Sequence, residues 1–137
     1  VAKQTQDQTI TMIFTSNLGE AAMSLGNYQH AIATFVEAIQ IAVELDRRNS
    51  ILNLMEQLGQ LAIYLNRWED AARLLGFAFA LREQLKIPVP PRDQKEHLER
   101  QNSLRKQLDL NYDLHWNNGQ SMGVSTAIMI ALSLQEV

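Results

Sequence analysis

Cysteine is absent from the 137 residues, so the chain can form no disulfide, no thiolate metal site and no cysteine nucleophile. Proline and glycine are scarce, with three and six residues, which suits long helices joined by short turns. The longest nearly unbroken apolar run, residues 127–134, is far shorter than the roughly 20 residues of a membrane-spanning helix. The first eight residues are polar and lack the basic start and apolar run of a signal peptide, so we expect a cytoplasmic protein.

Patterns of catalytic residues are also missing. No glycine-rich phosphate loop follows a strand-like segment, and no serine is paired with a base. The three histidines, His30, His97 and His115, fall in three different predicted helices, and none has a second metal ligand at a productive spacing. We therefore expect no catalytic residue, no metal and no cofactor. A small enzyme is the least supported of the functions considered.

Charge is balanced overall, with a net value of −3, but it is unevenly distributed. Residues 67–106 carry nine basic and six acidic side chains, whereas the segments on either side are acidic. An excess of three positive charges over forty residues is far below the dense basic stripe that nucleic-acid backbones attract. We therefore expect no direct contact with DNA or RNA.

An internal repeat appears when the sequence is shifted by 40 residues. Small residues then fall on small ones and large residues on large ones, from Leu18-Gly19 on Leu58-Gly59, through Tyr28 on Trp68, to Phe35 on Leu75. Within each unit, apolar residues recur at steps of three and four, as expected of helices. Gly26-Asn27 and Asn66-Arg67 break the pattern and predict short turns. Each unit is therefore a helical hairpin, in which Gly19 and Gly59 mark the places where a neighbouring helix crosses.

The small and large positions of the first unit resemble a tetratricopeptide repeat: Leu18, Gly19, Ala22, Leu25, Gly26, Tyr28, Ala31, Phe35 and Ala38. The second unit fits less fully, since Asn66 and Leu75 replace the turn glycine and the phenylalanine. Both units are longer than the usual repeat of about 34 residues. The resemblance implies an all-α fold of antiparallel helical hairpins stacked as a right-handed superhelix. Repeat one would span about residues 5–46 and repeat two about residues 48–86.

Beyond Leu85 the sequence predicts a helical tail that caps this single domain, at about residues 91–137. The prolines at 88, 90 and 91 interrupt the helix, and Pro91 is well placed to begin a new one. In that helix Leu98, Leu104 and Leu108 form the apolar stripe, with Arg100 among the residues that face water. Two further helices are expected, at residues 112–118, ending at Gly119, and at residues 124–134. The last of these is expected to cover the C-terminal end of the array.

The last half of the chain carries a second resemblance. Residues 72–76 (ARLLG), residues 80–83 (ALRE), residues 88–91 (PVPP), Trp116 with Gly119, and a final apolar helix occur in this order. This arrangement is similar to the C-terminal repeat region of large bacterial signalling-ATPase transcriptional regulators of the LuxR type. The resemblance implies that the chain is part of such a regulator.

The tetratricopeptide resemblance also implies where a partner would bind, because the first helix of each hairpin lines the concave face of such arrays. Carried over by register, that face includes Ile13, Ser16 and Ser24 of the first unit and Ile63 of the second, and eight further residues are our candidate site. These eight are Asn17, Glu20, Met23, Asn53, Glu56, Gln57, Gln60 and Tyr64. Their amides could hydrogen-bond an extended peptide or a polar effector. A solvated helix face without a ligand is the alternative interpretation.

We therefore expect a non-catalytic scaffold that binds a protein, a peptide or a small effector. The alternative is a structural module that serves assembly or oligomerisation and has no effector site. Homo-oligomers are possible because the apolar start of the first helix, including Ile10, Met12, Ile13 and Phe14, would remain open. No membrane partner is expected.

Overall fold

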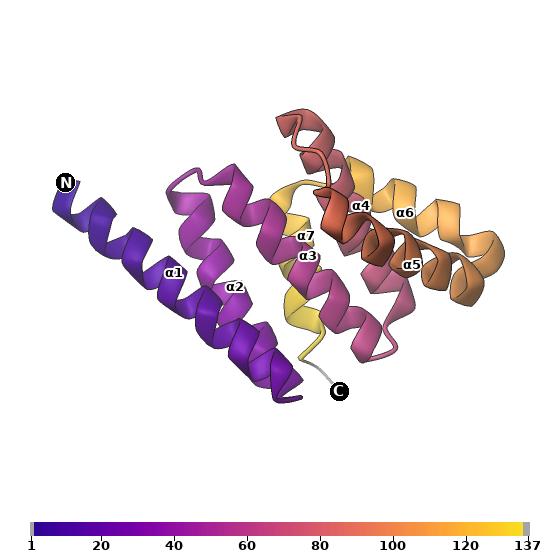
Figure 1. Cartoon of the computed structure of the whole chain (residues 1–137), viewed down its shortest axis with the longest axis horizontal. Helices are drawn as coiled ribbons and strands as arrows, with labels where there is room; N and C mark the ends of the chain where they lie inside the picture. The colour runs from indigo at the N-terminus through magenta and orange to yellow at the C-terminus, as the bar shows by residue number, and fades with distance from the viewer. Residues whose placement is uncertain (1, 136–137) are drawn as a thin grey trace.

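The computed structural model describes residues 2–135, and all regular structure in that range is helical, which confirms the all-α class (Figure 1). The elements in chain order are α1 (Ala2–Ser24), α2 (Tyr28–Glu44), α3 (Arg48–Tyr64), α4 (Trp68–Leu85), α5 (Pro91–Leu108), the short 3-10 helix η1 (Asp109–Asn111), α6 (Tyr112–Ser121) and α7 (Val124–Ser133). Among these described helices none is long and apolar enough to cross a membrane.

The first four helices end in the same way, at a residue with positive φ. At the end of α3, for example, Asn66 N donates to Ile63 O at 3.0 Å and Arg67 N donates to Ala62 O at 2.8 Å. These paired bonds satisfy carbonyls that the last helical turn leaves open. At these four helix ends the residues with positive φ lie 20 positions apart and are Gly26, Asp46, Asn66 and Lys86. The helix and its turn thus form a 20-residue unit, and two such units make the 40-residue repeat.

Glycines lie where the helices of each hairpin cross, as the sequence predicts. A Cβ atom built on Gly19 would lie 2.6 Å from the ring of Phe35, and one built on Gly59 would lie 2.5 Å from the side chain of Leu75. Phe35 and Leu75 are 40 positions apart, as are the two glycines. The same crossing, large side chain over glycine, therefore occurs in both hairpins.

The helices form two layers. Residues of α1, α3 and α5 share one hollow face, whereas α7 packs behind it, against α2 and α4 (Figure 1). Ala127, Ala131 and Leu134 of α7 are fully buried there. The sequence predicts that the last helix covers the C-terminal end of the array, and this prediction is wrong. The helix α6 occupies that end instead. The small side chains of α7 allow it to lie between α2 and α4, the second helices of the two hairpins.

Close backbone contact joins α6 to α4. A Cβ atom on Gly76 would lie 2.4 Å from the carbonyl oxygen of Trp116, and one on Gly119 would lie 2.1 Å from that of Arg73. Gly119 was expected to end α6, but the helix continues to Ser121. Its glycine serves helix packing rather than helix termination.

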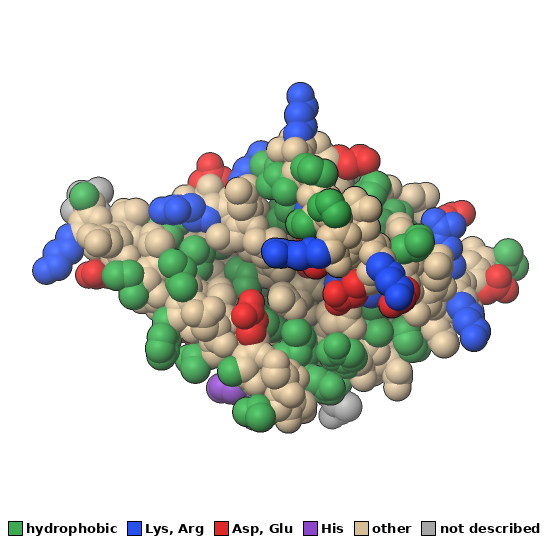
Figure 2. Space-filling model, in the orientation of Figure 1, with side chains coloured by type: hydrophobic (Ala, Val, Ile, Leu, Met, Phe, Trp, Pro, Cys, Tyr) green, Lys and Arg blue, Asp and Glu red, His purple; other side chains and the backbone are tan. Residues whose placement is uncertain are grey.

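The helix α5 begins at Pro91, as predicted, but its buried side differs from the predicted one. Leu104 is fully buried, whereas Leu98 is 59% exposed. Arg100, expected to face water, has a guanidinium Nε that is buried. Charged side chains of both signs gather over this helix in Figure 2. Polar contacts, of His97 with Glu56 of α3 and of Gln101 with Tyr112 of α6, therefore accompany apolar burial in setting its position.

Candidate binding site on the concave face

The structure brings all eight candidate residues to one face, where they line two adjoining hollows. The first hollow, of about 190 Å³, includes Asn17, Glu20, Asn53 and Gln57. The second, of about 360 Å³, includes every candidate except Asn17 and is walled by α5. Glu20, Asn53 and Gln57 line both, so the hollows form one continuous surface between α1 and α3.

Four amide side chains on this surface have no hydrogen-bond partner within the described part of the chain: Asn17, Asn53, Gln57 and Gln60. An amide offers a carbonyl acceptor and two N–H donors. All four belong to the first helices of the hairpins, α1 and α3. The face can therefore accept and donate hydrogen bonds along one strip.

Glu56 differs from the amides because its carboxylate is already occupied. Its Oε1 accepts a hydrogen bond from Arg82 Nη2 at 2.8 Å, and its Oε2 lies 3.6 Å from His97 Nε2. Burial, followed by the charge of Arg100, lowers the pKa of His97, and the opposing effect of Glu56 is smaller. Arg82 also donates from Nη1 to the carbonyls of Ile87 and Pro88, both at 3.2 Å. Glu56 thus contacts α5 through His97, and Arg82, which it orients, holds the proline turn.

Tyr64 lies at one end of the surface and stacks on Tyr28, with ring centroids 5.2 Å apart. About half of its side chain is exposed. Met23 is half-buried in the same hollow. This end of the amide strip is therefore apolar and aromatic.

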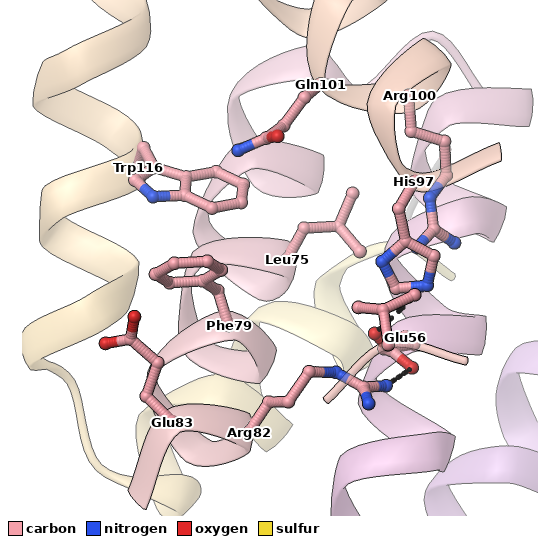
Figure 3. Close-up of a pocket in the computed structure, with 10 residues that line it drawn as sticks. Glu56, Leu75, Phe79, Arg82, Glu83, His97, Arg100, Gln101 and Trp116 are labelled. Carbon is pink, nitrogen blue, oxygen red and sulfur yellow. Dashed lines mark hydrogen bonds and ion pairs between the residues drawn. The ribbon is translucent and has the colours of Figure 1, made fainter. Parts of the chain in front are cut away.

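The sequence did not predict a further cavity, of about 150 Å³, which is lined in part by Glu56, Arg82 and His97 (Figure 3). Phe79 and Trp116 line it, whereas Phe35 and Phe77 are buried in the core. Leu75, Phe79, Arg82 and Glu83 share one side of α4, and their spacing of three and four residues was the only signal in the sequence. This spacing alone could not predict the cavity, because its other walls are formed by α5 and α6, which are distant from α4 in the sequence.

Comparison with protein families identifies the two hairpins. Residues 10–84 match the family model described as "Tetratricopeptide repeat", which covers more than half of the chain. The chain belongs to the tetratricopeptide-repeat family. No curated protein and no solved structure matches the chain.

Membership of the tetratricopeptide-repeat family gives a coarse functional class. Such repeats generally mediate contacts between proteins, and the family is a non-catalytic scaffold. The match includes all eight candidate residues and ends before α5. The tail helices that wall the concave face therefore lie outside the matched repeats.

Proposed function

We propose that this chain is a non-catalytic binding module whose concave face holds an extended segment of a protein partner, within a larger bacterial regulatory protein. The unpaired amides of Asn17, Asn53, Gln57 and Gln60 carry this proposal. An extended backbone presents both donors and acceptors, and side-chain amides can pair with either. The eight candidate residues act together as the contact surface, with Glu56 positioning α5.

The regulatory context rests on the resemblance of the tail to bacterial signalling-ATPase regulators. The tail also provides a physical route for a response. Because α5 borders the partner face through His97 and Arg100 and contacts α4, a partner that displaces it would alter the end of the array. A ligand shifts such an equilibrium only by its differential affinity for the two arrangements.

A peptide-display selection on the whole chain tests the binding face. The double variant Asn17→Ala with Gln57→Ala should weaken selected peptides by about tenfold or more, since each lost hydrogen bond contributes about 0.5–1.5 kcal/mol. The matched control is Gln40→Ala with Asn118→Ala, which removes two exposed amides from α2 and α6. Equal binding of the selected peptides to both double variants would contradict the proposal.

An assembly function is the second candidate, and the outer face of α1 favours it. Ile10, Phe14 and Leu18 form an exposed apolar stripe along this helix, and Leu25 extends it. Hydrophobic side chains are visible along this edge of the molecule in Figure 2. Apolar surface of this kind favours association. Sedimentation at increasing concentration checks it: an assembly module self-associates, whereas a persistent monomer argues against that role.

A further inference from the structure

The cavity between α3, α4, α5 and α6 has one apolar side and one charged side (Figure 3). Leu75, Phe79, Val89 and Trp116 supply apolar surface. The rings of Phe79 and Trp116 are 5.7 Å apart between centroids and tilted by 54°. These two rings contact each other and form one apolar wall, on which a ring or a branched alkyl group can pack.

The opposite side holds two guanidinium groups, from Arg82 and Arg100, and the carboxylate of Glu56, while the carboxylate of Glu96 acts on Arg100 from the same helix. Arg82 already uses its donors on Glu56 and on the carbonyls of Ile87 and Pro88. Glu83 also lines the cavity, but it is exposed and lies on the Phe79 side, away from Arg100 (Figure 3). The cavity therefore has an apolar end and a polar end with two guanidinium groups.

Arg100 is the group that lacks a partner. Its buried Nε–H donates a hydrogen bond to no described residue, and Arg100 has no ion pair in the described part of the chain. Burial lowers the pKa of this guanidinium, as expected when a cation loses water. A buried donor without an acceptor is costly, and an anionic acceptor provides the strongest compensation. The unmet requirement is for a hydrogen-bond acceptor at the Nε of Arg100.

The size of the cavity limits the ligand. At about 150 Å³ it equals the volume, about 150 Å³, of an apolar cavity that binds benzene. A single ring or a branched alkyl group fits, and a polycyclic body does not. A carboxylate oxygen is a strong acceptor for the unpaired Nε–H of Arg100.

We propose that this cavity binds a small carboxylate with an aryl or branched alkyl group, its carboxylate on Arg100 and its apolar part against the rings of Phe79 and Trp116. The site is separate from the eight residues of the peptide face except for Glu56. This proposal rests on the proposed scaffold function and adds a small-molecule effector to it, and its test is independent of the peptide selection.

The test is a titration of the whole chain with benzoate, phenylacetate and isovalerate, followed by the indole N–H signal of Trp116 in NMR spectra. The chain has two tryptophans, and a Trp68→Phe variant assigns the signals. At least one probe should saturate the Trp116 shift with a Kd of about 1 mM or lower, a value in keeping with about ten non-hydrogen atoms. Benzamide and benzyl alcohol, which lack the charge, should bind at least about tenfold more weakly than the best aryl carboxylate.

Arg100→Gln should weaken the carboxylates by at least about tenfold. Arg92→Gln, which removes a guanidinium that is 86% exposed from the same helix, should leave binding unchanged. No saturable shift with any carboxylate would overturn the proposal, as would equal binding of the neutral analogues. The analogue comparison uses the natural sequence, so it decides the matter even where Arg100→Gln impairs folding.

Discussion

The two hairpins have the same internal packing but different surroundings. Gly19 under Phe35 and Gly59 under Leu75 occupy equivalent positions in the 40-residue register. Outside the hairpins the equivalence ends. Phe14 is 63% exposed and Leu18 is 44% exposed, whereas their counterparts Leu54 and Leu58 are 4% and 0% exposed. The packing of α2 against α3 accounts for this difference, because no described element packs on the corresponding face of α1.

The hairpins also differ where the tail attaches. Glu56, which holds α5, corresponds to Ser16, and Gly76, which admits α6, corresponds to Val36. One sequence pattern thus specifies both hairpins, and substitutions at a few positions decide which tail helices can pack against each hairpin. Three predictions test this interpretation, beginning with the largest expected effect.

Identical substitutions at the equivalent leucines should have opposite consequences. Leu58→Glu buries a carboxylate at a fully buried position, and it should cost about 5 kcal/mol or more, enough to unfold a small domain. Leu18→Glu places the same group on an exposed face and should change the free energy of unfolding by less than about 1 kcal/mol. Urea unfolding of both variants measures the difference. Comparable losses would show that the outer face of α1 is not open.

Gly76→Val gives repeat two the residue that repeat one has at the equivalent position. The added carbons meet the backbone of Trp116, which cannot yield as a side chain can, so α6 must move. We expect a loss of about 3 kcal/mol, only partly offset by about 0.5–1 kcal/mol from replacing a helical glycine. Thermal unfolding measures it. Gly123→Ala is the control, since a Cβ there has no neighbour within 4 Å and should cost less than about 1 kcal/mol. A similar Tm for the two variants would refute the close approach of α4 and α6.

Sequence patterns predicted the hairpins well because each is built from local, periodic contacts. The crossings at Gly19 and Gly59, the turn at Asn66 and the helix start at Pro91 all depend on residues close in sequence. The register also brought the candidate residues, from Asn17 to Tyr64, to one face.

The tail was predicted less well because its contacts join distant segments. Leu98 and Leu104 have the same chemistry, and only the position of α5 leaves one exposed and buries the other. Gly119 suggests a helix end until the backbone of Arg73 is found beside it. The ion pair of Glu56 with Arg82 spans 26 residues and follows from no local pattern, so the cavity beside it was not foreseen.

The smallest of the three expected effects is on the pH dependence of the free energy of unfolding, to which His97 beside repeat two should contribute. His97 of α5 faces Glu56 of α3 and Arg82 of α4, with Asp93 and Arg100 on its own helix, and its pKa is lowered from 6.5, chiefly by burial. Since the folded state then binds fewer protons than the unfolded state, stability is complete above about pH 6.5 and falls as the pH drops from there towards the lower pKa of the folded state. One such group gives a slope of at most about 1.4 kcal/mol per pH unit. In urea unfolding at several pH values, His97→Gln should remove this part of the slope, whereas His30→Gln, on the exposed side of α2 in repeat one, should retain it. An unchanged slope in His97→Gln would mean that α5 does not desolvate the imidazole, and that the tail does not dock against repeat two as described.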